Sequence, residues 1–507
     1  MSKIVRTRFA PSPTGGLHLG GVRTALFSYL YAKQHNGQFV LRIEDTDQTR
    51  FVEGAEQYIN DTLTWCGIEP DESPAKGGQF APYRQSERKE MYMQYALQLI
   101  KSGNAYYAFD TPEDLEAMRN AHRSETNPNP QYDAKARMTM KNSLTLSAEE
   151  TTALLDANTR YVVRIKMPEN ELVTFTDMIR HEVSFDTNLL DDKVLVKADG
   201  MPTYHLAVVI DDYLMNITHA FRGEEWLPSA PIHILLWKYL GWENDMPNWA
   251  HLPLILKPDG NGKLSKRDGE RLGFPVFAKK WTDINGTARG YDDIGFLPSA
   301  FLNTLVMLGW NDGTDQEIFS LAEMIKKFDM GRVHKGGAKY DYEKAKWYNQ
   351  EWIKKMDAAQ INEFVKPLFG TENIDIKNED YFLAVCELVK ERCGLLPEFI
   401  PQARYFFEAP IAIDIDSIKL KWNDDKKNFF TEFIASTDKI SDWSVENIEE
   451  YFKNLATEKN IKVGELQLPM RIMLVGAKYG PTVFQIASRI GREESKSRIE
   501  KVLRILG

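Results

Sequence analysis

Cysteine is scarce in this chain of 507 residues, which has only Cys66, Cys386 and Cys393. None of them forms a Cys-x-x-Cys pair, and Cys66 is far from the other two. This spacing argues against a disulfide framework and against a zinc site, and it is typical of a protein from a reducing cytoplasm. Cys386 and Cys393 are seven residues apart and would share one face of a helix, so we expect both to be small core residues.

Long apolar runs are also missing. No segment approaches the ~20 apolar residues that a membrane-spanning helix needs, and residues 1–6 lack the apolar region of a secretion signal. We therefore expect a cytoplasmic protein that does not enter a membrane. The apolar content of 43% and charged content of 27% are ordinary for a soluble globular protein. The net charge of −10 speaks only weakly against a nucleic-acid partner, since binding depends on local patches.

The order of the expected elements divides the chain into an α/β part and a helical part. A strand–helix–strand pattern fills residues 1–105 and resumes over 193–257, which predicts a parallel sheet. Residues 106–192 interrupt this pattern with short strands and an exposed loop rich in Asn and Pro, so we expect an inserted domain. A turn-rich segment opens residues 258–335, and residues 336–507 are helical almost throughout.

The most informative motif is the proline- and glycine-rich turn at residues 9–21, between an expected strand and an expected helix. A strand, a glycine-rich turn and a helix N-terminus form a phosphate site, because outward N–H groups and the helix dipole favour negative charge. Gly15, Gly16, Gly20 and Gly21 would let the backbone approach a phosphate without a Cβ clash. His18 could donate to a phosphate oxygen. A plain helix start is the alternative interpretation.

A second motif, Lys-Leu-Ser-Lys-Arg, occupies residues 263–267 after a turn rich in Pro and Gly. Two lysines three residues apart on a mobile loop suit an electrostatic clamp on transferring phosphates, and the glycines beside them would let the loop close. The usual alternative for such a run of charge is a solvated basic loop.

These two motifs, about 240 residues apart, resemble the two signatures of class I aminoacyl-tRNA synthetases. Further segments make the chain similar to the bacterial glutamyl-tRNA synthetase family; they are residues 8–15, 41–47, 82–88, 202–206 and 221–226. Gly21 stands where the general signature has a second histidine, as often in this family. The resemblance implies a Rossmann-like α/β catalytic domain of parallel strands with an inserted α+β acceptor-binding domain, a helical stem-contact domain and all-α anticodon-binding domains.

The resemblance implies three substrates, namely ATP, L-glutamate and tRNA(Glu). His18, Lys263 and Lys266 would be catalytic, stabilising the transferring phosphates. The residues implied for ATP binding also include Gly20, Gly21, Glu225, Trp226 and Ser265, although Trp226 taken alone would more often be a core residue.

Mg²⁺ is expected with ATP, held largely by phosphates and water. No zinc is expected, because residues 105–109 lack the cysteine of some relatives. Asp45 and Asp47 could be metal ligands, but capping or salt bridging is at least as expected.

The glutamate site follows from the chemistry of the substrate. The α-carboxylate must stay free to attack, so the γ-carboxylate is the recognised end, and arginine binds a carboxylate through its planar fork. Arg8 and Arg222 end expected parallel strands, where ligands of open α/β sheets bind. Salt bridges from these arginines to the acidic residues of 44–47 are the alternative. The resemblance adds Tyr204 at the same end of glutamate, and Ser12 and Glu44 near its amino group.

The resemblance makes the helical tail an anticodon-binding region and places Arg392 at an anticodon base; it also implies a monomer. A glutaminyl-tRNA synthetase stays possible, although that family has β-barrels at its anticodon end. A tRNA-modifying relative would lack the C-terminal domain. A non-catalytic nucleotide- or tRNA-binding regulator would not need the intact His18, Lys263 and Lys266.

Overall fold

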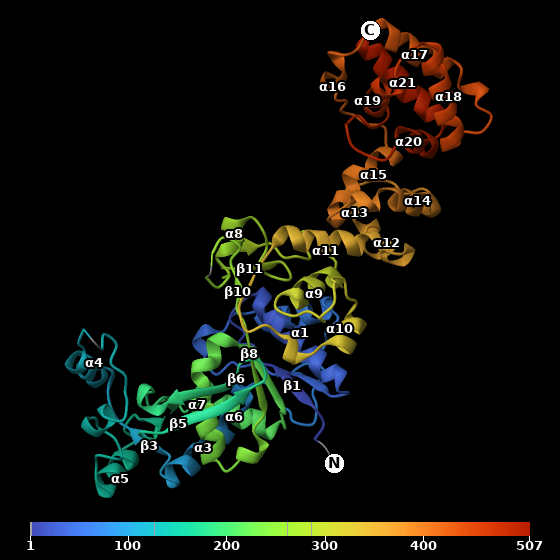
Figure 1. Ribbon diagram of the computed structural model, residues 1–507. Coiled ribbons are helices and arrows are strands. Elements are labelled where there is room, and N and C mark those ends of the chain that lie inside the picture. Colours follow the sequence, from blue (N-terminus) through green and yellow to red (C-terminus); the bar gives the residue numbers. More distant parts are fainter. Residues whose placement is uncertain (1–2, 126, 261, 285) are drawn as a thin grey trace. The chain divides into compact units, whose positions relative to one another are not determined.

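The computed structural model describes residues 3–125, 127–260, 262–284 and 286–507 (Figure 1). Thr126 and Asn261, which fall in two of the expected loops, lie outside the described residues. The chain divides into two compact units. Unit 1 consists of Met1–Asp293 and Phe301–Tyr342, and unit 2 consists of Ile294–Ala300 and Glu343–Gly507.

A six-stranded sheet forms the centre of unit 1, in the order β2-β1-β8-β9-β5-β6. Its strands are β1 (Arg6–Phe9), β2 (Gln38–Leu41), β5 (Leu172–Asp177), β6 (His181–Asp186), β8 (His219–Gly223) and β9 (Asn248–Leu252). All neighbours pair in parallel except the β5–β6 hairpin, so the predicted parallel sheet is confirmed. Buried strands such as β1 are covered on both faces, as parallel sheets require.

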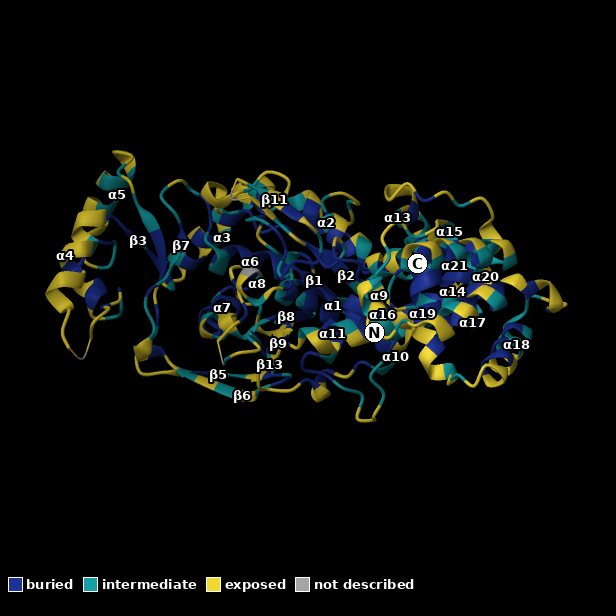
Figure 2. Cartoon of the chain, turned by 90° about the horizontal axis from the view of Figure 1, so that it is seen from above, coloured by how far each residue is buried: buried dark blue, intermediate teal, exposed yellow. Residues whose placement is uncertain are grey.

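Helices bury this sheet. The first, α1 (Leu19–Gln34), packs against β1, β2 and β8. The others of this part are α2 (Ala55–Trp65), α3 (Lys89–Lys101), α6 (Tyr204–Leu214) and α7 (Ala230–Tyr239). The apolar faces of α3, α6 and α7 form one core with residues of β8 and β9. Figure 2 shows the buried region around β1, β2, β8 and α1 in dark blue.

A smaller antiparallel sheet has the order β3-β4-β7 and lies in the predicted insert with two helices. These elements are β3 (Ala105–Ala108), α4 (Pro112–His122), α5 (Ala148–Asp156), β4 (Val162–Ile165) and β7 (Val194–Val196). The strand–helix–strand pattern resumes at residue 193 as predicted, but its first strand, β7, pairs with β4 rather than with the main sheet. Conversely, β5 and β6 from within residues 106–192 extend the main sheet. The sequence pattern of a strand does not specify which strand it pairs with, because tertiary contacts decide the pairing.

Two strands on either side of Pro253 belong to different sheets. The first, β9, ends at Leu252, and the second is β10 (Ile255–Leu256), which pairs with β13 (Ala338–Lys339) in a smaller sheet. Pro253 lies between them and has no N–H to continue a ladder. The remaining elements of this region are α8 (Asp268–Leu272), β11 (Trp281–Asp283), β12 (Gly286–Ala288), α9 (Pro298–Met307) and α10 (Leu321–Lys327).

Unit 2 is helical, as predicted, around a core rich in phenylalanine. Its helices are α11 (Tyr342–Lys354), α12 (Ala358–Phe364), α13 (Lys366–Thr371), α14 (Glu379–Val389), α15 (Phe399–Phe407), α16 (Asp416–Lys419), α17 (Asp424–Ala435), α18 (Val445–Glu458), α19 (Val463–Val475), α20 (Val483–Ile490) and α21 (Arg492–Leu506). Cys386 and Cys393 are buried in this core, which confirms their predicted role.

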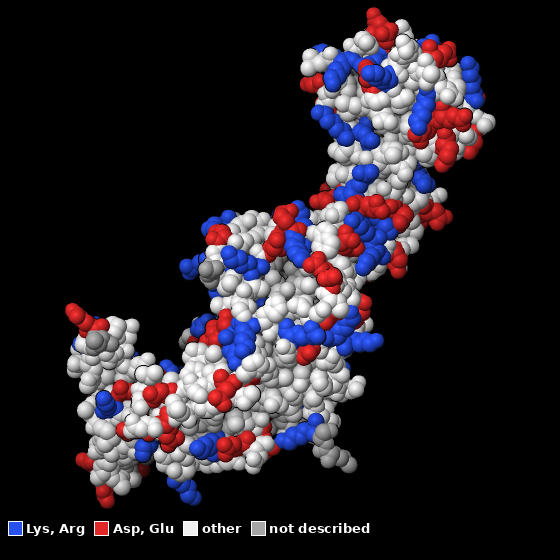
Figure 3. Space-filling view, in the orientation of Figure 1, with Lys and Arg blue, Asp and Glu red and all other residues white. Residues whose placement is uncertain are grey.

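Acidic and basic side chains lie interspersed on the face of the molecule drawn in Figure 3. Within the described ranges, no helix is both long and apolar enough to cross a membrane.

Candidate functional site

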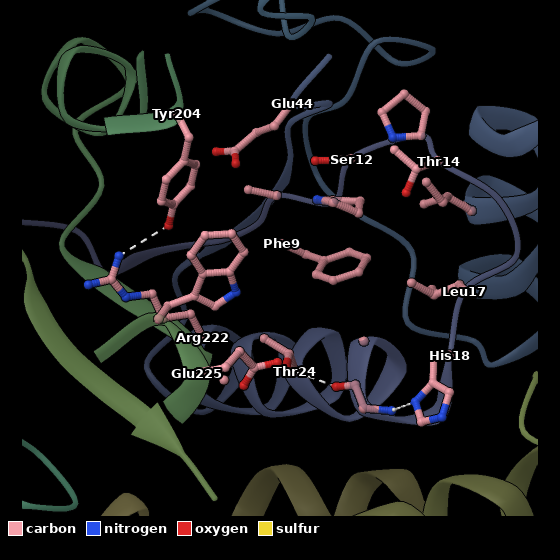
Figure 4. A pocket seen from close by; sticks show the side chains of 18 of the residues that line it. Phe9, Ser12, Thr14, Leu17, His18, Thr24, Glu44, Tyr204, Arg222 and Glu225 are labelled. Carbon is pink, nitrogen blue, oxygen red and sulfur yellow. Dashed lines mark hydrogen bonds between the residues drawn. The ribbon is translucent and has the colours of Figure 1, made fainter. Parts of the chain in front are cut away.

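One cavity of about 880 Å³ in unit 1 gathers the predicted site residues. It lies where the turn after β1, the N-terminus of α1, the end of β8 and the loop after β10 meet. Every residue predicted for catalysis, ATP or glutamate lines it: Arg8, Ser12, His18, Gly20, Gly21, Glu44, Tyr204, Arg222, Glu225, Trp226, Lys263, Ser265 and Lys266. Arg392 belongs to unit 2 and is exposed. Figure 4 shows Arg222 and Tyr204 at one end of the site and His18 at the other.

His18 presents a neutral hydrogen-bond donor to the cavity. Its Nδ1 caps α1 by accepting from the amide of Gly20 at 3.1 Å. Burial, and then the charges of Lys263 and Lys266, lower the pKa of His18 to about 4. A neutral ring that accepts at Nδ1 carries its proton on Nε2. That nitrogen is buried, and no described residue bonds to it, so it can donate to a ligand oxygen.

The amides in the first turn of α1 have partners within the chain. Leu19 donates to the carbonyl of Val276 at 3.0 Å, Gly21 to the carbonyl of His18 at 2.8 Å, and Gly20 to the His18 ring. The expectation of outward-pointing N–H groups is therefore wrong for Leu19, Gly20 and Gly21, because nearby acceptors already satisfy these amides. The donor at this end of the cavity is instead the imidazole that caps the helix.

The basic loop is held by a set of polar contacts. Ser265 donates from its amide and its hydroxyl to one oxygen of Asp268, at 2.9 and 2.5 Å. The other oxygen of Asp268 lies 2.9 Å from the Nζ of Lys257. Lys263 forms an ion pair with Glu225, so two residues expected at ATP neutralise each other here.

Lys266 brings the two sequence motifs together. A Cβ placed on Gly15 would lie 3.5 Å from its Nζ, so the ammonium reaches the turn after β1. It also lies 5.8 Å from the ring centre of Phe277. Burial lowers the pKa of Lys266. The cation therefore lies beside the first motif, as an electrostatic clamp requires.

Arg8 is part of a buried ion network. Its Nε lies 3.1 Å from Asp212 of α6, and one Nη donates to the carbonyl of Phe221. Arg42 also bonds to Asp212, at 2.8 Å, and to Glu44, at 2.9 Å. Arg8 thus forms a structural ion pair, as the alternative interpretation expects, but its partner is Asp212 rather than an acidic residue of 44–47. Burial raises the pKa of Glu44, against the effect of Arg42.

Arg222 differs from Arg8, because the alternative of a salt bridge is wrong for it. The residue is 8% exposed. Its Nε donates to Nε2 of His251 at 2.9 Å, and one Nη donates to Nδ1 of His233 at 2.9 Å and to the hydroxyl of Tyr204 at 3.1 Å. None of these partners is a carboxylate, and within the described part of the chain its second Nη atom is buried without a partner. A buried cation of this kind is costly without an anion, so the site fits a carboxylate ligand.

Trp226 lines the cavity and is 42% exposed, so the expectation of a core residue is wrong. It lies in the 3-10 turn after β8, and its ring centre is 4.6 Å from that of Tyr204. Of the two aspartates, only Asp47 has the expected capping role. Asp45 accepts from the amide and hydroxyl of Ser86, and Asp47 caps the next 3-10 turn. Among the described residues, no group of three His, Cys, Asp or Glu side chains could hold a metal ion.

Several residues of the site were missed from the sequence. They are Arg42 and its partners Asp211 and Asp212, and the groups around Arg222, namely Asp177, His233 and His251. A signal existed for two of these sets. Adjacent aspartates and a histidine stand in the apolar runs of α6 and α7, where a polar residue needs a partner.

The arrangement has two chemically different ends. Arg222 and Tyr204 suit the binding of a carboxylate, whereas His18, Lys263 and Lys266 suit negatively charged phosphates. A molecule with a carboxylate at each end could therefore meet a phosphate compound within one cavity.

Comparison with known proteins covers nearly the whole chain. Residues 4–347 match the family described as tRNA synthetases class I (E and Q), catalytic domain, and residues 343–503 match an anticodon binding domain. The chain is 51% identical over 506 residues to a glutamate–tRNA ligase of Flavobacterium psychrophilum, and 50% identical over 506 residues to that of Flavobacterium johnsoniae. Each alignment covers 100% of both chains.

Two solved structures are similar over their full length. One is a glutamate tRNA ligase from Elizabethkingia meningosepticum in complex with its amino acid, with a TM-score of 0.95, 46% identity and 100% coverage of both chains. The other is a glutamate–tRNA synthetase from Elizabethkingia anophelis, with a TM-score of 0.91 and 46% identity; the match covers 99% of this chain and 100% of that one.

Proposed function

Because the chain belongs to the glutamate–tRNA ligase family of class I synthetases, we propose that its cavity activates L-glutamate with ATP and then transfers the glutamyl group to tRNA(Glu). The surroundings of Arg222 are the observation that supports assigning this reaction to the cavity. Its buried guanidinium has only neutral described partners and an unoccupied Nη donor. The γ-carboxylate of glutamate supplies the missing anion.

Activation is an in-line displacement. The α-carboxylate oxygen of glutamate attacks the α-phosphorus of ATP, the bond to the bridging oxygen breaks, and pyrophosphate leaves with glutamyl-adenylate formed. No general base is needed, because the attacking carboxylate is already ionised at neutral pH. Catalysis then comes from positioning and from stabilising the charge on the phosphates.

His18, Lys263 and Lys266 provide that stabilisation. The neutral His18 donates from Nε2, which is buried and has no described partner. Lys263 must first leave Glu225, and we propose that the ATP phosphates replace this carboxylate. Glu225 is then available to the ribose hydroxyls, with Gly20, Gly21, Trp226 and Ser265 lining the nucleotide. Mg²⁺ enters as part of the ATP substrate.

At the opposite end, Tyr204 and Arg8 join Arg222 around the γ-carboxylate, while Ser12 and Glu44 lie toward the amino group. Glu44 supplies the negative charge that an ammonium group needs, and Arg42 holds its carboxylate from the other side. In the second step the 2′-hydroxyl of the terminal adenosine attacks the carbonyl carbon of the adenylate, and AMP leaves.

The rest of the chain would bind the tRNA. We assign residues 1–105 and 193–257 to the catalytic domain, 106–192 to the acceptor end, 258–335 to the stem, and 336–507 to the anticodon, with Arg392 at a base. We further propose a cytoplasmic monomer that contains no zinc. The buried thiols of Cys66, Cys386 and Cys393 suit a reducing compartment.

Two assays test this function. Pyrophosphate exchange into ATP should require glutamate, and the family resemblance leads us to expect that it also requires tRNA. Charging of tRNA(Glu) with labelled glutamate should follow. Absence of both activities in the folded protein would overturn the assignment, and exchange at full rate without tRNA would remove the tRNA requirement alone.

A further inference from the structure

Arg222 owes its orientation to groups that carry no charge. It is the last but one residue of β8, and its guanidinium carbon lies 5.3 Å from the ring centre of Trp249. Its paired residue on β9 is His251. Paired positions of neighbouring parallel strands present their side chains on one face, which brings the imidazole to the Nε of the arginine.

The protonation of His251 follows from its two neighbours. Arginine only donates, so Nε2 of His251 must accept from Arg222 at 2.9 Å. The ring proton then sits on Nδ1, which lies 2.6 Å from an oxygen of Asp177. One hydrogen bond of a histidine decides which nitrogen is free for the other, so Asp177 keeps His251 in the form that accepts from Arg222.

Asp177 is itself saturated with donors. Its carboxylate also accepts from three amides, those of Ile179 and Arg180 at 2.9 Å and that of His251 at 3.1 Å. Burial opposes ionisation, but the bonds from the His251 ring and from the amides of Arg180 and Ile179 lower the pKa of Asp177. The aspartate is therefore ionised, and it reaches Arg222 only through the imidazole of His251.

A second histidine acts from helix α7. His233 accepts from Arg222 at Nδ1, so its proton lies on Nε2, which is 3.2 Å from Nδ1 of His205. Both rings are neutral, because burial lowers the pKa of His205 to about 4 and holds the pKa of His233 well below its ordinary value. His233 thus also binds the guanidinium without adding a negative charge.

The hydroxyl of Tyr204 completes this arrangement. Its oxygen accepts from Arg222, so its own proton remains for another acceptor. Burial raises the pKa of Tyr204, which keeps this proton in place at neutral pH. Beside it is the buried Nη atom for which no described residue is a hydrogen-bond partner. The hydroxyl of Tyr204 and this Nη atom of Arg222 are therefore two hydrogen-bond donors at the same end of the cavity, where Figure 4 shows both residues.

We propose that His251, held by Asp177, and His233 are positioning residues that orient Arg222 while leaving its charge for the substrate, and that they thereby set the selectivity of the site for glutamate over glutamine. This inference rests on the proposed function. A carboxylate in place of either ring would neutralise the guanidinium, whereas an apolar side chain would leave it free to turn away from the ligand.

The selectivity has a simple physical origin. A buried arginine held only by neutral acceptors gains a full ion pair from a γ-carboxylate but only a weaker hydrogen bond from a γ-amide. A site built for one polar partner rejects an analogue that leaves its buried groups unpaired. If Arg222 loses its orientation, the binding of glutamate should therefore be weakened more than the binding of glutamine.

The test compares side chains of similar size that differ in their acceptor. His251→Met removes the acceptor, while His251→Gln keeps a neutral oxygen near the position of Nε2. In tRNA charging at saturating ATP, His251→Met should raise the KM for glutamate roughly 10- to 100-fold, the value of one hydrogen bond to a charged group. It should leave the KM for ATP unchanged and reduce the preference for glutamate over glutamine. His251→Gln should retain most of the affinity.

The same comparison is made at His233 of α7, so that the test does not depend on the folding of one variant. His233→Leu should act like His251→Met, and His233→Asn, whose oxygen replaces Nδ1, should act like His251→Gln. His219→Gln is the control, since His219 is a buried histidine on the same strand whose contacts are with Tyr31, Thr218 and Asn248 rather than Arg222. It should keep the wild-type KM for glutamate, and thermal melting of each variant reports folding.

Calorimetric titration with glutamate and with glutamine separates the possible failures. Wild-type protein that binds neither amino acid and charges no tRNA would overturn both the proposed function and this inference. Wild-type protein that charges tRNA, with folded Met and Leu variants of unchanged KM and selectivity, would overturn this inference alone. Equal losses in the folded Met and Gln variants would also overturn it, because the effect would then not depend on the acceptor.

Discussion

Single residues in the cavity differ in whether their charge is already compensated. Arg8 and Arg42 share the carboxylate of Asp212, so their charges stabilise the fold as well as the site. Arg222 has no carboxylate among its described contacts, and Lys263 has one that is exposed and exchangeable. Arg222 and Lys263 therefore gain more than Arg8 from the anion that a substrate adds.

Lys266 gives a prediction at this scale. Lys266→Ala should lower kcat for glutamate activation by about 100-fold, the usual effect of removing one preorganised donor to a developing charge, with a smaller effect on the KM for glutamate. Steady-state exchange and charging assays measure both. Lys280→Ala removes an exposed lysine from outside the cavity lining and should behave as wild type. A near-normal kcat in Lys266→Ala would remove this lysine from the mechanism.

At the scale of elements, the turn between β1 and α1 is shaped by packing as much as by ligand binding. A Cβ on Gly16 would lie 2.9 Å from ring atoms of both Phe277 and Trp281, which are buried. A Cβ on Gly20 would have only an ordinary contact, at 3.6 Å, with the ring of His18. Both glycines line the cavity, but only Gly16 is also packed against these two rings, so the glycines of one motif serve different purposes.

Two alanine substitutions separate these purposes. Gly16→Ala should destabilise the protein by about 1–3 kcal/mol, as expected for overpacking. Gly20→Ala should keep or slightly raise the stability of α1, but it should raise the KM for ATP roughly 10-fold, since an added methyl group in a fitted pocket is rejected by about that factor. Thermal unfolding and initial-rate kinetics give the two readouts. A stable Gly16→Ala, or a Gly20→Ala with an unchanged KM for ATP, would contradict the respective assignment.

At the scale of the whole molecule, the histidines are unevenly divided between the two units. All nine histidines of the chain precede residue 343 and lie in unit 1, whereas unit 2 has its own helical core and no histidine. Burial lowers the pKa of His18, His205 and His219 to about 4. The two units should therefore respond differently to acid.

The sign of this effect follows from proton linkage. Between pH 6.5 and pH 4 the unfolded chain binds protons that the native His219 does not, so stability rises with pH in this window and is lost on acidification. For His219 the loss between pH 7 and pH 5 is about 2 kcal/mol from the two pKa values. Calorimetry should show two transitions, and acidification should lower the Tm of unit 1 more than that of unit 2. His219→Gln should reduce that difference; equal shifts in both transitions would contradict the prediction.

Much of the site was predictable from the sequence because its chemistry is local. The turn at residues 9–21 and the loop at 263–267 each combine residue types that suit phosphates, and the arginines at two strand ends suit a carboxylate. The partners of these groups were not predictable. Asp212, His233 and His251 reach the arginines only through the pairing of β8 with β9 and the packing of α6 and α7, which no local pattern specifies.

The sequence by itself determined the class of the fold, the helical tail and the residue types that handle phosphates and a carboxylate, since these follow from periodicity and short-range chemistry. Only the tertiary structure decided which strands pair, which amides are already satisfied, and which cations are left without a counter-charge. Those properties depend on neighbours far apart in the chain, and they decide how the cavity can hold a substrate.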